Sequence, residues 1–198
     1  MQNIKKQMKL IKKNIINILF FGFIIFIFTP FGLGTRAKLT QGVTYIKTLI
    51  LPPKTEAVEN RKEFNTDFQL KGLMHATDVN LNKLNNKVVF INYWATWCPP
   101  CRAEMPSIQS LYDDYKDKIE FIFITTDTKL KVEKFYLNNS YKLPTYNIMS
   151  DPPQEISTRS IPATFILDKQ TKIALSEFGP ANWNSDKVRK LLDELIAE

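Results

Sequence analysis

Residues 88–106 read VVFINYWATWCPPCRAEMP, and this stretch decides the fold. It holds the chain's two cysteines, Cys98 and Cys101, which are separated by two prolines. Residues 88–94 are apolar, β-branched or aromatic apart from one asparagine, a pattern that predicts a buried central strand. A helical pattern begins at the cysteines. We therefore expect a strand that delivers both cysteines onto the first turn of a helix.

The first turn of a helix favours thiol chemistry. Its unpaired N–H groups and the positive end of the helix dipole stabilise a thiolate. This lowers the thiol pKa and makes the sulfur a nucleophile at neutral pH. Prolines are tolerated there because these N–H groups lack partners within the helix. The pattern predicts a redox-active dithiol that needs no bound cofactor.

Other uses of two cysteines fit less well. A structural zinc site needs four ligands, and the chain offers at most three, because it has no third cysteine and one histidine, His75. We expect His75 to lie in a solvated loop, and we expect no metal site. A purely structural disulfide across so short a loop would constrain the unfolded chain little.

The motif YWATWCPPC followed by RAEMP resembles the active site of the thioredoxin superfamily. It is most similar to the membrane-anchored, extracytoplasmic branch called TlpA-like or ResA-like, and the resemblance extends from Phe64 to the C-terminus. It implies an α/β, thioredoxin-like fold with a central mixed sheet flanked by helices, an N-terminal strand extension and a central αβ insertion. It also implies a thiol–disulfide oxidoreductase acting as a protein-disulfide reductase.

Three residues of the motif receive chemical roles. Cys98 is expected to be the more exposed thiol of lower pKa, which attacks a partner's disulfide, and Cys101 resolves the mixed disulfide. Glu104 follows Cys101 by three positions and so shares its helix face. Its spacing alone leaves open an ordinary exposed glutamate, but the resemblance implies an acid that handles protons. Thioredoxin has a buried aspartate in the strand where Asn92 stands here.

A second site element lies at Ile161 and Pro162. Most bonds before proline are trans, but the pattern SIPATFIL resembles the superfamily's cis-proline loop, which faces the two cysteines. The resemblance implies a cis Pro162 and backbone groups of Ile161 that pair with an extended substrate.

The aromatic residues near the motif divide into surface and core. We expect Trp97 and Pro99, beside the first cysteine, to contribute to the substrate-binding surface. Trp94 is expected in the core, and no role is assigned to Trp183.

The remaining elements alternate between strand and helix, as expected of an α/β domain. After the active-site helix we expect a buried strand at 119–124. The insertion is a helix at 131–138 and a strand at 146–149. A hairpin at 165–168 and 172–178 precedes a C-terminal amphipathic helix.

The basic charge lies at the N-terminus. The 198-residue chain has a net charge of +7, and residues 1–38 hold seven of its 27 basic residues and no acidic residue. The other 160 residues hold 20 basic and 20 acidic residues. A nucleic-acid-binding face needs clustered basic residues, so the domain is not expected to bind nucleic acid.

The N-terminal segments resemble a membrane anchor. We expect a basic cytoplasmic segment at 1–13, a transmembrane anchor at 14–35, a tether at 36–63 and the thioredoxin-like domain at 64–198. Basic residues before the apolar stretch favour a cytoplasmic N-terminus and a domain on the extracytoplasmic, periplasmic side. A cleaved signal peptide would have a similar basic start.

The resemblance further implies disulfide-bearing protein substrates, a membrane thiol-electron carrier as electron source and a role in cytochrome c maturation. The direction of electron flow stays open, so a disulfide oxidase or isomerase is the alternative. A copper-binding chaperone is another, because soft thiolates suit Cu(I).

Overall fold

The computed structural model describes residues 14–22, 26, 29, 61–63, 65–84 and 86–198. It divides into two compact units, Met1–Val43 and Thr44–Glu198. Residues 14–22 are helical. Among the described residues, no helix is long and apolar enough to cross a membrane. The expected basic segment, half of the expected anchor and most of the expected tether lie outside these residues.

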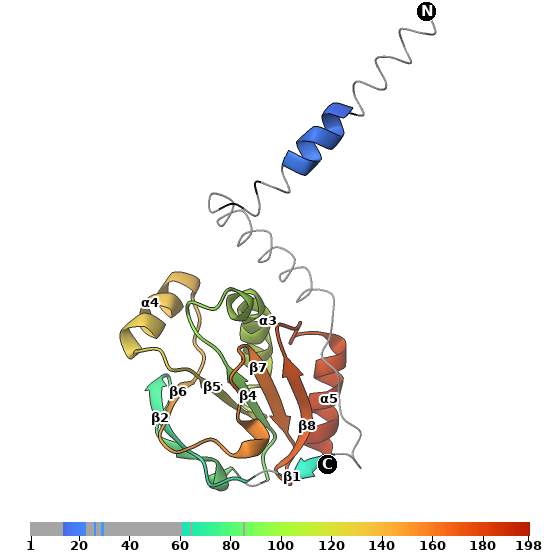
Figure 1. The fold of residues 1–198 in the computed structure, drawn as a ribbon. Helices are drawn as coiled ribbons and strands as arrows, with labels where there is room; N and C mark the ends of the chain where they lie inside the picture. The colour runs from blue at the N-terminus through green and yellow to red at the C-terminus, as the bar shows by residue number, and fades with distance from the viewer. Residues whose placement is uncertain (1–13, 23–25, 27–28, 30–60, 64, 85) are drawn as a thin grey trace, which may run out of the picture. The chain divides into compact units, whose positions relative to one another are not determined.

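The second unit is built on one mixed sheet of eight strands, in the order β1-β8-β7-β4-β5-β6-β2-β3 (Figure 1). The pairs β4–β5 and β5–β6 are parallel, and the other five pairs are antiparallel. The strands are β1 (Lys62–Glu63), β2 (Gln69–Met74), β3 (Val79–Asn80), β4 (Val89–Tyr93), β5 (Glu120–Ile124), β6 (Thr145–Ile148), β7 (Ala163–Leu167) and β8 (Lys172–Phe178).

Helices cover this sheet. They are α3 (Pro99–Tyr115), α4 (Lys129–Asn139) and α5 (Asp186–Ala197), with 3₁₀ turns η3 (Leu81–Lys83) and η4 (Gln154–Ile156). Apolar side chains of α3, α4 and α5 share one core cluster with Phe90 of β4 and Phe123 of β5. Val89 and Ile91 of β4 belong to a second cluster with Phe68 and Leu81. Because β4 is buried on both faces, it is apolar throughout except for Asn92.

The predicted fold class is confirmed: a central mixed sheet is flanked by helices. The N-terminal extension is the hairpin of β2 and β3, and the insertion is α4 followed by β6. The predicted strand at 119–124 and the hairpin at 165–168 and 172–178 are also present.

Residues just before the expected domain start at residue 64 also pair with the sheet. Lys62 and Glu63 pair with β8 as an edge strand. The Arg61 guanidinium contacts Asp168 at 3.0 Å and Glu198 at 2.8 Å, and the first contact is almost fully buried. These partners are more than 100 positions away along the chain, so the local charged composition gave no sign of them.

Candidate active site

The two cysteines lie where α3 begins. Cys98 is its N-cap, and Pro99 and Pro100 are its first two residues. Cys98 and Cys101 form a disulfide with their Cα atoms 5.3 Å apart, and the Cys101 N–H points to the Cys98 sulfur at 3.3 Å. A thiolate at Cys98 would accept this hydrogen bond and face the positive end of the helix dipole. In the disulfide, both residues are buried, Cys98 being 3% exposed and Cys101 0%.

The turn before the cysteines is held by the neighbouring strand. The Thr96 N–H donates to Asp127 Oδ2 at 2.7 Å, and Asp127 itself is buried just beyond the end of β5. The Trp94 N–H donates to the Ile124 carbonyl at 3.0 Å, which continues the pairing of β4 with β5. The loop that carries Cys98 is therefore positioned by the sheet.

The Ile161–Pro162 peptide bond is cis, as the resemblance implied. The Ile161 carbonyl oxygen lies 3.8 Å from the Cys98 sulfur, so this loop faces the disulfide. The Pro162 carbonyl accepts a hydrogen bond from the Gly179 N–H at 2.9 Å. Gly179 has φ = 101°, a conformation that favours glycine. This contact joins the proline loop to the segment that follows β8.

Exposed apolar side chains belong to the segment that carries the disulfide and to the strand that pairs beside the proline loop. Trp97 is 66% exposed, and Pro99 is also exposed. Phe178 is 57% exposed and lies opposite Ala163, the residue after Pro162. Trp94 is buried, as expected of a core residue, and it stacks on Tyr136 of α4 with ring centroids 5.6 Å apart.

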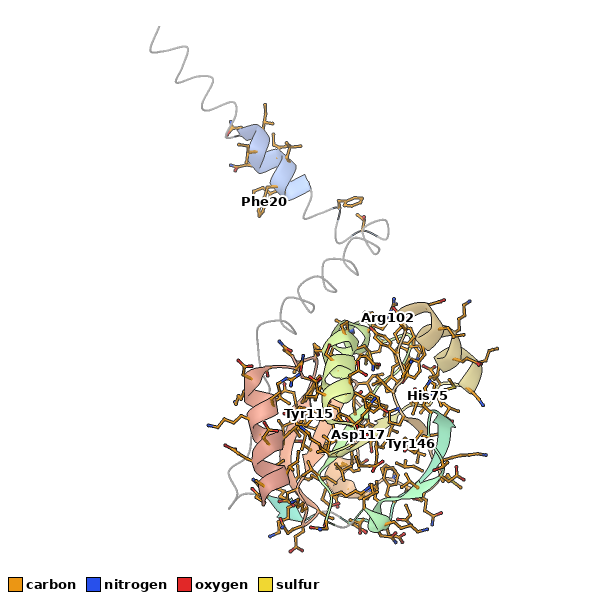
Figure 2. The ribbon with its side chains drawn as sticks, turned by 180° about the vertical axis from the view of Figure 1, so that it is seen from behind. Phe20, His75, Arg102, Tyr115, Asp117 and Tyr146 are labelled. Carbon is orange, nitrogen blue, oxygen red and sulfur yellow. A yellow bond between two sulfur atoms is a disulfide. The ribbon has the colours of Figure 1, made fainter. Side chains whose placement is uncertain are left out.

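The insertion packs against the active-site helix. The Arg102 guanidinium, on the first turns of α3, lies 5.8 Å from the ring centroid of Phe135 on α4. Figure 2 shows Arg102 beside this helix. His75, also labelled there, is exposed and stacks on Tyr136 at 6.3 Å. In the described part of the chain, no group of three or more histidine, cysteine, aspartate or glutamate residues could hold a metal ion.

Glu104 is fully buried beneath the disulfide-bearing turn of α3. Its Oε1 accepts a hydrogen bond from Asn92 Nδ2 at 3.0 Å. Its Oε2 accepts from Trp183 Nε1 at 2.8 Å and from the Ala181 N–H at 3.3 Å. The glutamate is therefore not the ordinary exposed residue that its spacing left open.

The surroundings of Glu104 raise the pKa of its carboxyl group to about 8. Desolvation by burial is the largest cause, because it penalises the charged form. The three donors, on Trp183, Asn92 and Ala181, partly oppose it by stabilising the carboxylate, and the nearby charge of Glu177 on β8 adds to it. At neutral pH this group holds a proton that it can release, which suits proton transfer.

The sequence did not predict the hydrogen-bond partners of Glu104. Trp183, left without a role by the sequence, is fully buried and packs edge-on against Phe90 at 5.2 Å. Its backbone N–H donates to Ser107 Oγ on α3, and its indole N–H donates to Glu104 Oε2. No local pattern marks this contact across 79 positions. Asn92 did carry a signal, because a polar side chain in a buried strand needs hydrogen-bond partners.

Curated relatives match part of this chain. The thiol-disulfide oxidoreductase ResA of Oceanobacillus iheyensis is 47% identical over 74 residues, 35% of this chain and 38% of that protein. The thioredoxin-like protein YneN of Bacillus subtilis is 35% identical over 109 residues, 52% of this chain and 63% of that protein. The match thus spans less than two thirds of either relative.

Solved structures share the fold. A secreted thiol-disulfide isomerase from Corynebacterium glutamicum superposes with a TM-score of 0.57 at 23% identity, over 73% of this chain and 92% of that one. A thiol:disulfide interchange protein of the thioredoxin family from Chlorobium tepidum gives 0.55 at 18% identity, over 68% and 97%. Residues 62–176 match the AhpC/TSA family. The chain therefore belongs to the AhpC/TSA family and has a thioredoxin-like fold.

Proposed function

We propose that this protein is a thiol–disulfide oxidoreductase that reduces disulfides in other proteins through Cys98 and Cys101. The observation that carries the proposal is the disulfide at the N-terminus of α3, facing the Ile161–Pro162 loop at 3.8 Å. The exposed Trp97 beside it offers an apolar surface for a protein substrate. The names of the curated relatives support the same chemistry.

The reaction exchanges one disulfide for another. In the reduced enzyme, the Cys98 thiol loses its proton and the thiolate attacks one sulfur of the partner's disulfide, forming a mixed disulfide. The partner's other sulfur leaves as a thiolate and takes up a proton. The Cys101 thiol then loses its proton and attacks the Cys98 sulfur. This restores the enzyme disulfide and releases the partner's second sulfur, which is also protonated.

Glu104 is the group proposed to accept and return a proton during this exchange. It lies one turn after Cys101 on α3, and its pKa of about 8 is close to that of an ordinary thiol. Because Glu104 is fully buried, its ionised form offers a proton acceptor, and its protonated form a donor, where water has little access.

The direction of electron flow is tested by the reduction potential of the full-length protein, equilibrated in glutathione or dithiothreitol buffers. A reductant is expected to have a potential of about −270 mV, near that of thioredoxin, or below. A value near −120 mV, typical of strong thiol oxidants, would contradict the reductase and favour the oxidase.

The proposed setting is the extracytoplasmic side of a membrane, where a membrane thiol carrier supplies electrons, as in cytochrome c maturation. The basic residues before the apolar stretch at 15–28 support an anchor with a cytoplasmic N-terminus. The full-length protein is expected to stay in the membrane fraction after alkaline carbonate washing. External protease should then remove its domain from spheroplasts. Release by carbonate would contradict the anchor, and protection from protease would contradict the orientation.

A further inference from the structure

The two oxygens of the Glu104 carboxyl group have different partners. Oε2 lies against the Trp183 indole N–H and the Ala181 backbone N–H, both of which can only donate. A proton on Oε2 would point toward donors and break at least one of these bonds. Among the described residues, the hydrogen-bond partner of Oε1 is the side chain of Asn92, and an amide has one donating and one accepting end. The carboxyl proton is therefore best accommodated on Oε1.

Asn92 uses only one end of its amide. Its Nδ2 donates to Glu104 Oε1 at 3.0 Å and to Thr164 Oγ1 at 2.8 Å. Its Oδ1 is buried and has no hydrogen-bond partner among the described residues. This orientation suits an ionised Glu104, which accepts from the amide. It does not suit a protonated Oε1, because two donors would then face each other.

We propose that Asn92 is a positioning residue whose side-chain amide flips by about 180° when Glu104 gains or loses its proton. With Glu104 ionised, Nδ2 faces the carboxylate. With Oε1 protonated, Oδ1 takes that place and accepts the Oε1 proton in a hydrogen bond. In either orientation one end of the amide faces Glu104 and Thr164, and the other end is left buried without a partner, so neither orientation pairs the whole amide.

Thr164 is suited to follow this change. Its hydroxyl both donates and accepts, so it can accept from Nδ2 in one orientation and donate to Oδ1 in the other. The register of the sheet holds it in place, because Asn92 of β4 and Thr164 of β7 are paired opposite each other. A valine of the same shape would lose both interactions.

In the described part of the chain, few charged groups act on the cluster formed by Glu104, Asn92 and Thr164. Glu177 on β8 is the described residue whose charge raises the Glu104 pKa. On α3, Cys101 lies one turn before Glu104 and titrates only when reduced. In the oxidised protein, the titration of Glu104 can therefore be followed without that of Cys101. The use of this coupling in thiol exchange rests on the proposed function, but the coupling itself is a property of the folded, oxidised protein.

The first test follows the amide directly. The oxidised full-length protein, with ¹⁵N in asparagine and tryptophan, is titrated by NMR from pH 5 to pH 10. We expect the Asn92 amide and Trp183 indole signals to shift with one midpoint. The nuclear Overhauser contact from the Asn92 NH₂ group to Thr164 should be strong above the midpoint and weak below it. An unchanged contact at both ends of the titration would overturn the proposal.

The second test compares two variants in the same oxidised state, with the infrared band of the protonated carboxyl group reporting the Glu104 midpoint. Trp183→Phe removes a donor that favours the carboxylate, and we expect the midpoint to rise by about one pH unit. Asn92→Leu removes a group that bonds both protonation states, so its shift should be less than half as large. Equal upward shifts of the Glu104 midpoint in the two variants would mean that Asn92 only donates to Glu104. This would contradict the amide flip. Neither experiment depends on reductase activity, so their failure would leave the proposed function untouched.

Discussion

A Cys98→Ser variant is expected to lose all measurable disulfide reduction. The serine hydroxyl is not ionised at neutral pH and cannot form a mixed disulfide, so the first step of the exchange has no nucleophile. Activity is measured as reduction of a protein disulfide such as that of insulin, with the enzyme reduced by dithiothreitol beforehand. The variant should keep its circular dichroism spectrum, because serine fills nearly the same space at the N-cap and can accept the Cys101 N–H.

The matched variant Cys101→Ser keeps the nucleophile and loses the resolving thiol. It should accumulate mixed disulfides with partner proteins, visible as bands on a non-reducing gel that disappear on reduction. A Cys98→Ser protein that still reduces disulfides, or a Cys101→Ser protein that traps none, would contradict the assigned roles. Reversed behaviour of the two variants would exchange the roles of Cys98 and Cys101.

Replacing Glu104 with glutamine is expected to stabilise the oxidised protein at neutral and alkaline pH. Burial raises the pKa of this carboxyl group from 4.5 to about 8 in the folded state, whereas the unfolded chain keeps the ordinary value. Between these two values the folded protein holds a proton that the unfolded chain releases, so stability falls as pH rises. The slope is about 1.4 kcal/mol per pH unit, and the loss across the window reaches roughly 4–5 kcal/mol.

Glutamine resembles the protonated acid and does not titrate. The difference in unfolding free energy between Glu104→Gln and the natural protein should therefore be small near pH 4.5. It should grow up to pH 8 and stay constant above that. Urea unfolding at several pH values measures it, with the exposed Glu133→Gln as a matched control that removes a surface carboxylate. A difference independent of pH would show that the Glu104 carboxyl group is not protonated in the folded protein.

The sequence determined much of the fold through local patterns. The apolar residues of β4 and β5 mark strands buried on both faces, and the spacing of apolar residues marks the C-terminal helix. These signals are strong because they arise from neighbouring residues on one element. The edge strand Lys62–Glu63 was not predicted, because a strand of two residues has no such pattern.

The features of the site also divide into those that the sequence predicts and those that only the tertiary structure sets. The sequence by itself determined the positions of Cys98, Cys101 and Glu104, because their spacing places them on the first turns of one helix. It also determined, through resemblance, the loop at Ile161 and Pro162.

Only the tertiary structure decided the burial of Glu104 and its hydrogen-bond partners. Asn92, Trp183 and Ala181 come from a central strand and a distant loop, 12 to 79 positions away, and they meet at one carboxyl group because the sheet and α3 pack together. The pKa of a carboxyl group depends on burial and on the donors that surround it. These are properties of the assembled core, and no local stretch of the sequence encodes them.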